Sequence, residues 1–368
     1  MGQAWIDGKP VALKAAIARA AELLAASRFP VFAGLGTDVA GTRAAVALAR
    51  RLRGAIDHMN SSAYLRDLDV MREAGMMLTT PAEARLRADM LLLIGPALVA
   101  RWPELPAVLF APVENPRNGA RRVTWLCPPR DAKKLVPAEL PLQTVGRNPE
   151  ELAPLVAMLR ARVAGRNVGK GPASVKVLDA LAADIQTTPF GVAVWSADDL
   201  DALTIQMLCG LVSDLNAGTR FTGLSLSQGD NAIGVSEVCG WLTGFPVRTG
   251  FGRDIPEHDP WRFEATRLVD SGEADCAVWI SSYRAAGPPW QRDVSLIALT
   301  GEEASFRRPP LVHIAVGCPG IDHDCVEHNA MLRTLAQVKA RAPRETVSVA
   351  DALADIDAAL PQNGAASC

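Results

Sequence analysis

The chain has 368 residues, of which 49% are hydrophobic and 21% charged, and its formal net charge is -2. This length exceeds the roughly 250 residues at which a single hydrophobic core usually stops growing, so two domains are expected. The charge balance provides no basic field that would attract phosphates, which excludes nucleic acid as an expected partner. The seven cysteines, the first at position 127, form no C-x-x-C pair, so reduced buried thiols are expected instead of disulfides or an iron-sulfur cluster.

The sequence also carries no membrane signal. The N-terminus lacks a basic segment followed by an apolar stretch, and no apolar run approaches the roughly 18 residues that a membrane helix needs. We therefore expect no membrane association and a cytoplasmic location.

Predicted strands and helices alternate along the chain. Residues 5–11 surround an Asp-Gly turn and predict a hairpin, and a helix follows over 13–24. The apolar run 30–33 predicts a buried strand that leads into an alanine-rich helix over 41–54. Further strands are predicted at 89–95, 123–127, 191–195, 276–281, 294–299 and 311–317, further helices at 150–164, 173–185 and 200–215, and a glycine-rich surface connection at 164–172. This alternation is typical of α/β proteins with parallel sheets and helices on both faces.

Four stretches, in this order, carry a family resemblance. They are W-I-D-G-K-P-V running into F-P-V-F-A-G-L-G-T and G-A-I-D at 54–57, the segment 218–244 around N-A-I-G-V-S-E-V-C-G-W-L-T-G-F-P, the segment 268–282, L-V-D-S-G-E-A-D-C-A-V-W-I-S-S, and V-G-C-P-G-I-D at 316–322. Together the stretches resemble the molybdopterin-binding subunit of formylmethanofuran dehydrogenase and, more distantly, the formate dehydrogenase superfamily. The resemblance covers most of the chain.

The resemblance implies a fold. We expect two Rossmann-like parallel-sheet units of the formate dehydrogenase/molybdopterin oxidoreductase type. One is discontinuous and combines residues 1–57 with 245–368, and the second spans 58–244.

Two departures from the family pattern concern the cofactor. The dehydrogenase chains begin with a cysteine-rich segment that holds a four-iron cluster, whereas this chain starts at the hairpin, so we expect the iron-sulfur domain to be lacking. Shortly after G-A-I-D the family supplies a cysteine or selenocysteine to molybdenum or tungsten, but this sequence reads H-M-N-S-S at 58–62. A metal held by pterin dithiolenes favours a soft thiolate ligand, so we expect no cofactor.

The pattern is similar to the truncated homologue in the formyltransferase/hydrolase complex of methylotrophic bacteria. There formyl groups move from a tetrahydromethanopterin carrier through a methanofuran-type cofactor and are hydrolysed to formate. The resemblance implies a non-catalytic structural subunit, a pseudoenzyme, whose partners are an amidohydrolase-like subunit, a formyltransferase subunit and a further structural subunit. Two alternatives stay open, namely an active molybdopterin- or tungstopterin-dependent dehydrogenase subunit and a binding module that guides a methanofuran-like cofactor.

The remaining candidates for cofactor contact are vestigial: Gly34, Gly36, Ser61, Ser62, Gly229 and Asn231. The glycine pair after a strand is suited to a pyrophosphate or to a tight strand-helix turn, and we favour the turn. Gly229 and Asn231 belong to a region, 224–232, that approaches the pterin in the family. A serine ligates the metal in some molybdenum enzymes, but we favour Ser61 and Ser62 as the N-cap of a helix through 65–71. His58 is interpreted as structural.

No catalytic residue and no metal site are predicted. Four side chains within eleven residues can bind zinc, but their spacing fits no common template: Cys318, His323, Cys325 and His328. Aromatic and arginine residues at 261–263, 283–284 and 288–292 fit interface anchors and ordinary loop packing equally well.

Overall fold

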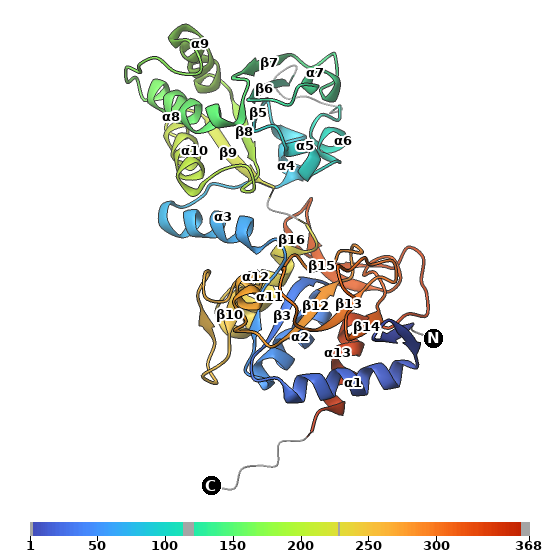
Figure 1. The fold of residues 1–368 in the computed structure, drawn as a ribbon. Coiled ribbons are helices and arrows are strands. Elements are labelled where there is room, and N and C mark those ends of the chain that lie inside the picture. Colours follow the sequence, from blue (N-terminus) through green and yellow to red (C-terminus); the bar gives the residue numbers. More distant parts are fainter. Residues whose placement is uncertain (1–2, 113–120, 227–228, 362–368) are drawn as a thin grey trace. The chain divides into compact units, whose positions relative to one another are not determined.

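The computed structural model describes residues 3–112, 121–226 and 229–361, and the chain separates into two compact units (Figure 1). Unit 1 comprises residues 1–61, 229–329 and 334–368, and unit 2 comprises 62–228 and 330–333. The sequence analysis placed the divisions after residues 57 and 244, whereas the structure places them after 61 and 228. Residues 229–244 therefore belong to unit 1, because the helix within them packs against the first strand-helix pair of that unit.

Unit 1 is built on a nine-stranded sheet in the order β11-β10-β4-β3-β12-β13-β14-β1-β2. The five central strands, β4, β3, β12, β13 and β14, run parallel to one another. The strands are β1 (Ala4–Ile6), β2 (Lys9–Val11), β3 (Pro30–Gly36), β4 (Ala55–Ile56), β10 (Thr249–Gly250), β11 (Glu257–His258), β12 (Cys276–Ser281), β13 (Ser295–Thr300) and β14 (Val312–Ala315).

The expected parallel sheet is thus present at the centre of unit 1. The prediction is wrong at the two edges of the sheet, where the strands pair antiparallel. The predicted hairpin forms as β1 and β2, and β1 pairs antiparallel with β14. At the other edge, β10 and β11 also pair antiparallel. These short edge segments carry too few residues to reveal their direction in the sequence.

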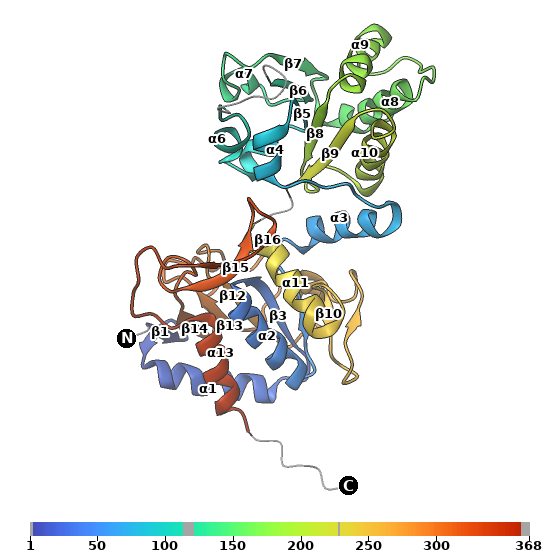
Figure 2. The same cartoon turned by 180° about the vertical axis from the view of Figure 1, so that it is seen from behind.

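Four helices pack side by side in the order α1, α13, α2, α11 (Figure 2). They are α1 (Leu13–Ala26), α2 (Val39–Arg51), α11 (Ala232–Thr243) and α13 (Val349–Ala359). The short helix α12 (Ala265–Ser271) packs with Val31 and Ala33 of β3 and with Trp279 of β12 in a separate apolar cluster. Because side chains alternate along a strand, the neighbouring Phe32 belongs to the opposite face.

Unit 2 contains a five-stranded sheet in the order β7-β6-β5-β8-β9, and every strand pair in it is parallel. The strands are β5 (Met90–Ile94), β6 (Arg122–Leu126), β7 (Leu142–Val145), β8 (Phe190–Trp195) and β9 (Arg220–Ser225). The helices are α3 (Ser61–Ala74), α4 (Pro81–Arg87), α5 (Leu98–Arg101), α6 (Leu105–Leu109), α7 (Ala132–Leu135), α8 (Leu152–Val163), α9 (Val175–Gln186) and α10 (Ala202–Leu215), with a 3-10 turn at Pro149–Glu151.

The core of unit 2 has two layers, one on each side of its sheet. Met90, Leu92 and Ile94 of β5 pack with α8, α9 and α10, while Leu91 and Leu93 pack with α4, α5 and α6. This alternation within a fully apolar strand is the expected pattern for a parallel sheet covered on both faces. The chain is therefore an α/β protein with parallel sheets, as the sequence analysis predicted.

Two further observations complete the fold. The hairpin of β15 (Cys325–Asn329) and β16 (Thr334–Val338) forms a separate two-stranded sheet that the sequence analysis did not anticipate. None of the helices in the described part of the chain is long and apolar enough to cross a lipid bilayer.

We predict that Gly34→Ala lowers the free energy of unfolding of unit 1 by about 3–5 kcal/mol. Gly34 has φ +79°, and an added Cβ would lie 2.5 Å from the carbonyl oxygen of Ile280 on the neighbouring strand. Gly244→Ala is the matched control, since Gly244 has φ +82° but nothing within 4 Å of the added carbon. This substitution should lower the free energy of unfolding by only about 1–2 kcal/mol, the cost of the left-handed backbone conformation for alanine. Equal losses in calorimetric unfolding would contradict the close-packing explanation.

Candidate functional site

The candidate site lies at the carboxyl ends of the central strands of unit 1. From β3 the chain passes to β4 on one side, while β12 leads to β13 and β14 on the other. Ligands of open α/β sheets bind at such a reversal of strand order, outside the carboxyl ends of the strands. Here Gly36 ends β3 and Ser281 ends β12, and the backbone N–H and hydroxyl of Ser282 both donate to the Gly36 carbonyl at 2.8 Å.

The glycine turn at the end of β3 serves packing within the protein. Gly34 lets β3 approach the backbone of β12, because an added Cβ would lie only 2.5 Å from the Ile280 carbonyl oxygen. At Gly36 an added Cβ would meet the Met59 methyl carbon at 3.1 Å and Asp230 Cβ at 3.4 Å. The protein's own side chains therefore cover this turn.

The start of α2 carries a carboxylate of its own. Asp38 is 7% exposed, and its Oδ1 accepts a hydrogen bond from the Gly41 backbone N–H at 2.9 Å. Backbone N–H groups at a helix N-terminus attract anions, and Asp38 supplies one as the N-cap of α2.

The segment 229–231 crosses over the same end of the sheet. Gly229, Asp230 and Asn231 have φ values of 153°, 52° and 62°, a run of positive-φ backbone that other contacts must hold. The Asn231 amide donates to the Thr37 carbonyl at 2.8 Å and accepts from the His328 N–H at 3.0 Å. Gly229 and Asn231 thus connect strands and loops of unit 1, while the neighbouring positions 227 and 228 lie outside the described residues.

Asp230 is the charged centre of this segment. Its side chain is 8% exposed and lies 2.8 Å from the Arg284 guanidinium. The Asn60 amide donates to Asp230 Oδ2 and to the Gly229 carbonyl, both at 3.1 Å. A guanidinium and an amide therefore compensate the carboxylate within the protein.

His58 binds the 229–231 segment in its neutral form. Its Nδ1 accepts from the Asn60 backbone N–H at 2.9 Å, which leaves Nε2 as the donor to the Asp230 carbonyl at 3.0 Å. Burial lowers the pKa of His58 to about 4, although the nearby Asp230 groups oppose this shift. Both ring nitrogens are engaged, so the histidine has no nitrogen left to act as a base.

Asp57 links β4 to two distant segments of the chain. Its Oδ1 accepts from the His58 N–H and its Oδ2 from the Ala265 N–H, each at 2.9 Å, and Arg248 Nε lies 3.4 Å from Oδ1. Burial raises the pKa of Asp57 to about 6, against the opposing effects of Arg248, Ala265 and Ser61. The carboxylate is thus ionised at neutral pH and neutralises a guanidinium that is itself only 12% exposed.

The two serines next to this network have different surroundings. Ser61 is the first residue of α3, not its N-cap, and its hydroxyl accepts from Arg248 Nε at 3.1 Å. Ser62 is exposed. The N-cap interpretation of Ser61 is therefore wrong in detail, because the hydroxyl belongs to the Asp57 network.

The histidines and cysteines near residue 320 do not converge. Cys325 and His328 stand three residues apart on β15, which places their side chains on opposite faces of the strand. The Cys318 backbone N–H donates to the carboxylate of Asp322 at 2.7 Å, which closes the turn there. Across the described residues, no three His, Cys, Asp or Glu side chains are grouped to hold a metal ion.

The family resemblance implies a pterin cofactor with a metal, and the residues at this site do not fit that group. Met59 and Asp230 cover the glycine turn, and Asp38 satisfies the start of α2. Where a soft thiolate would face the metal, the chain has His58 with both nitrogens bound. The arrangement suits a structural clamp made of internal ion pairs and hydrogen bonds.

Sequence reasoning named Gly34, Gly36, Ser61, Gly229 and Asn231, and the structure brings these five positions to one end of the unit 1 sheet. It did not name Asp230 or Arg248, and it considered Arg284 only as an interface anchor, although these three charged side chains organise the site. The G-A-I-D stretch was the one local signal, because its last residue is Asp57. The aromatic residues considered as interface anchors differ in burial. Phe263 and Trp290 are 3% and 7% exposed, whereas Trp261 is 72% exposed.

Comparison with known proteins gives consistent results. The B subunit of the formyltransferase/hydrolase complex Fhc from Methylorubrum extorquens is 32% identical, over 98% of this chain and 99% of the relative. The crystal structure of the FhcABCD complex from that organism, with methylofuran, matches with a TM-score of 0.85 and 33% identity, over 97% of this chain and 98% of the matched chain. No protein-family profile matches the sequence.

More distant relatives are tungsten-containing enzymes. The B subunits of tungsten-containing formylmethanofuran dehydrogenase 2 from Methanococcus maripaludis and Methanocaldococcus jannaschii are 24% and 25% identical. In each case the alignment covers 75% of this chain and 65% of the relative. The resemblance drawn from the four sequence stretches is thereby confirmed.

We predict that His58→Asn removes a component of acid destabilisation. The unfolded chain takes up a proton on His58 below pH 6.5, whereas the folded chain does so only near pH 4. The stabilisation is therefore fully present above pH 6.5 and falls by about 3 kcal/mol as the pH drops to 4. The asparagine would keep an acceptor for the Asn60 N–H and has no proton to gain.

The measurement is urea unfolding of both proteins between pH 4 and pH 7. The stability difference between wild type and His58→Asn should shrink with acidification, and a constant difference would contradict the buried neutral histidine. Asp57 has a raised pKa and therefore acts in the opposite direction, so that its stabilisation falls as the pH rises from 3.8 to about 6. It is present in both proteins, so the comparison largely removes its effect.

Proposed function

The chain belongs to the family of formyltransferase/hydrolase complex B subunits, and we propose that it is a non-catalytic structural subunit of such a complex. Its place is tetrahydromethanopterin-linked one-carbon metabolism, in which formaldehyde-derived formyl groups become formate. The proposed partners are an amidohydrolase-like subunit, a formyltransferase subunit and a further structural subunit, and the proposed location is the cytoplasm. The similarity to the Fhc relative over 99% of that protein carries this proposal.

The non-catalytic role draws support from the candidate site. In unit 1 the strand ends that bind ligands in other α/β proteins are closed by Met59, Asp230 and Asp38. His58 is neutral and bound at both nitrogens, and Asp57 and Asp230 are paired with Arg248 and Arg284. Each of these buried groups therefore has partners within unit 1 that account for its presence there.

We further propose that both units are Rossmann-like and that this chain's cysteines hold no iron-sulfur cluster. Unit 2 supports the first point, because its order β7-β6-β5-β8-β9 extends outward in both directions from the first strand. The second point is supported by the dispersion of the described cysteines. Cys127 and Cys209 belong to unit 2, whereas Cys239, Cys276, Cys318 and Cys325 belong to unit 1.

An active tungsten- or molybdenum-dependent subunit is the second candidate, and the similarity to the two tungsten-containing relatives favours it. It requires a ligand other than thiolate at residues 58–62. Ser61 already accepts a hydrogen bond from Arg248, so its hydroxyl would have to leave the Asp57 network. The third candidate, a module that guides a methanofuran-like cofactor, has no observation of its own in the described residues.

An exposed apolar segment supports the structural role. Among the large hydrophobic side chains that are exposed, five lie between residues 241 and 261: Trp241, Leu242, Phe245, Ile255 and Trp261. Tryptophan at 66% and 72% exposure is unusual on a free surface and is enriched at protein interfaces. We propose that this segment contacts a partner subunit.

The experiment is purification of the native assembly with this chain tagged, followed by elemental analysis and identification of the co-purifying chains. We expect hydrolase-like and formyltransferase subunits, with molybdenum and tungsten near zero per chain. A double variant, Trp241→Ser with Trp261→Ser, should weaken the association at least about 30-fold and reduce co-purification accordingly, because each lost aromatic anchor costs about 1–2 kcal/mol. Leu203→Ser, at a site 62% exposed in unit 2, is the control.

Two results would overturn the proposal. About one molybdenum or tungsten per chain would establish the dehydrogenase alternative and make Ser61 the first residue to substitute. Purification of the tagged chain without any hydrolase or transferase subunit would remove the structural role.

A further inference from the structure

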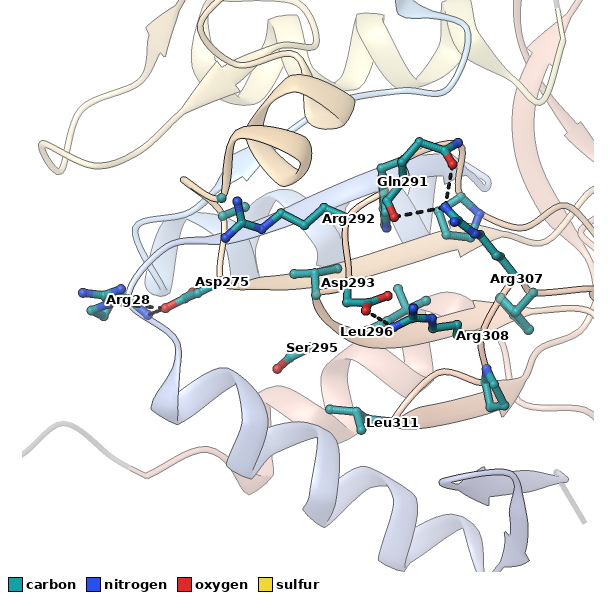
Figure 3. A pocket seen from close by; sticks show the side chains of 17 residues that line it. Arg28, Asp275, Gln291, Arg292, Asp293, Ser295, Leu296, Arg307, Arg308 and Leu311 are labelled. Atoms are coloured by element: carbon teal, nitrogen blue, oxygen red, sulfur yellow. Dashed lines mark hydrogen bonds and ion pairs between the residues drawn. The ribbon is translucent and has the colours of Figure 1, made fainter.

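A second cleft lies at the opposite end of the unit 1 sheet, where the parallel strands begin (Figure 3). It has a volume of about 640 Å³. Ser295 is the first residue of β13, while Asp275 and Leu311 directly precede β12 and β14. The cleft is therefore separate from the candidate site at the carboxyl ends of these strands.

Arginines dominate the charge of this cleft. Its lining contains Arg28, Arg292, Arg307 and Arg308 against two acidic residues, Asp275 and Asp293. Figure 3 shows that these arginines lie on different sides of the cleft. The excess of two positive charges contrasts with the net charge of -2 of the whole chain.

Asp275 is already engaged within the chain, because it forms an ion pair with Arg28, the Nε of which lies 3.5 Å from Asp275 Oδ2. Its carboxylate accepts hydrogen bonds from the Ser27 hydroxyl and from the backbone N–H groups of Arg28 and Phe29, the latter two at 2.9 and 3.2 Å. These donors fix the turn before β3. The one remaining acidic group in the lining, Asp293, pairs with Arg308 in an ion pair whose members are 61% and 68% exposed.

Two of the arginines have no acidic partner among the described residues. The Arg292 guanidinium lies over Gly272, where an added Cβ would be 2.5 Å from its central carbon. Arg307 donates only to Gln291, reaching its backbone carbonyl at 3.1 Å and its side-chain oxygen at 2.5 Å. Both guanidinium groups keep N–H donors for an acceptor from outside.

The backbone that carries Arg292 is held in place. Asp270 accepts from the N–H groups of Gln291 and Arg292 at 2.8 and 3.0 Å. Trp290 is buried and packs edge-on against Trp279, with ring centroids 5.5 Å apart. The lining thus combines exposed arginines with apolar side chains that include Trp290, Leu296 and Phe306.

We propose that this cleft binds an acidic polypeptide segment of a companion subunit, with carboxylates paired to Arg292 and Arg307 and an apolar side chain packed against the apolar side chains of the lining. The identification of the segment's owner as a companion subunit rests on the proposed function. The cleft itself is defined by its own residues, and it gives the stretch 288–292 of the sequence a role beyond loop packing.

A polypeptide fits these observations better than a phosphate. Phosphate sites use clustered backbone N–H groups at a glycine-rich turn or helix start, and the N–H groups of Gln291 and Arg292 are already bound by Asp270. Planar guanidinium groups bind carboxylates in a two-point geometry, and the apolar side chains of the lining offer burial to a neighbouring side chain.

The first test measures binding to the purified full chain by fluorescence anisotropy. The probe is a labelled seven-residue peptide with four glutamates around one leucine, and its partner control has glutamine in place of each glutamate. We expect the acidic peptide to bind and the glutamine peptide to bind at least about tenfold more weakly. Raising the salt from about 50 to 300 mM should weaken binding by about tenfold as well, because exposed charges are screened.

Matched variants locate the site. Arg292→Glu with Arg307→Glu should lower affinity for the acidic peptide at least about tenfold, and Arg292→Gln with Arg307→Gln should lower it less. Arg43→Glu with Arg50→Glu changes two exposed arginines of α2 and should alter affinity less than about twofold. No binding, an equal loss in the α2 variant, or displacement of the peptide by millimolar inorganic phosphate would each overturn the proposal.

The second test separates this inference from the proposed function. The tagged Arg292→Glu/Arg307→Glu chain should retain less of one companion subunit than wild type in the native assembly. If the companions co-purify equally well and the peptide does not bind, the cleft proposal fails while the structural role stands. If no companion co-purifies with wild type, the structural role fails and the anisotropy experiment alone decides whether the cleft takes an acidic peptide.

Discussion

The buried carboxylate of Asp57 is the contact on which unit 1 depends. It receives the N–H groups of His58 and Ala265 and pairs with Arg248, so that β4, the β10 edge and the start of α12 share one acceptor. The two oxygens of this one carboxylate thereby join the N-terminal part of the chain to segments about 190 to 210 residues later. Burial opposes the charge, and the surrounding donors make it tolerable.

The opposite charge pattern at the two ends of the unit 1 sheet follows from how each carboxylate is used. At the carboxyl ends, Asp38, Asp57 and Asp230 are all engaged by donors of the same unit. A carboxylate that already accepts hydrogen bonds within the protein has less capacity to bind a ligand. At the amino ends, arginines outnumber acids and two of them lack an acidic partner in the described structure. The arginines without an acidic partner in this cleft thus lie at the end of the sheet opposite to the one where α/β proteins usually bind ligands.

Long apolar runs made the central strands predictable, because β3, β5 and β12 are buried along their whole length and read as continuous hydrophobic stretches. The two-residue strands β4, β10 and β11 give no periodic signal, and β15 alternates too weakly among polar residues. The glycines and Ser61 of the site were found from a family pattern. The roles of Arg248 and Arg284 were not, since they arise only when distant segments meet.

The second domain boundary was predicted after residue 244, at the end of α11, whereas the structure places it after residue 228, before that helix.

The split of unit 1 across the chain has a consequence for its biogenesis. The inner strand β3 pairs with β12, whose first residue, Cys276, is made 240 residues after Gly36. At about 5–20 residues per second on a ribosome, the interval is about 12–48 s. During that time residues 62–228 can fold as a unit of their own, while the apolar edge of β3 waits uncovered. The topology thus leaves this strand edge unpaired for as long as the intervening chain takes to be made.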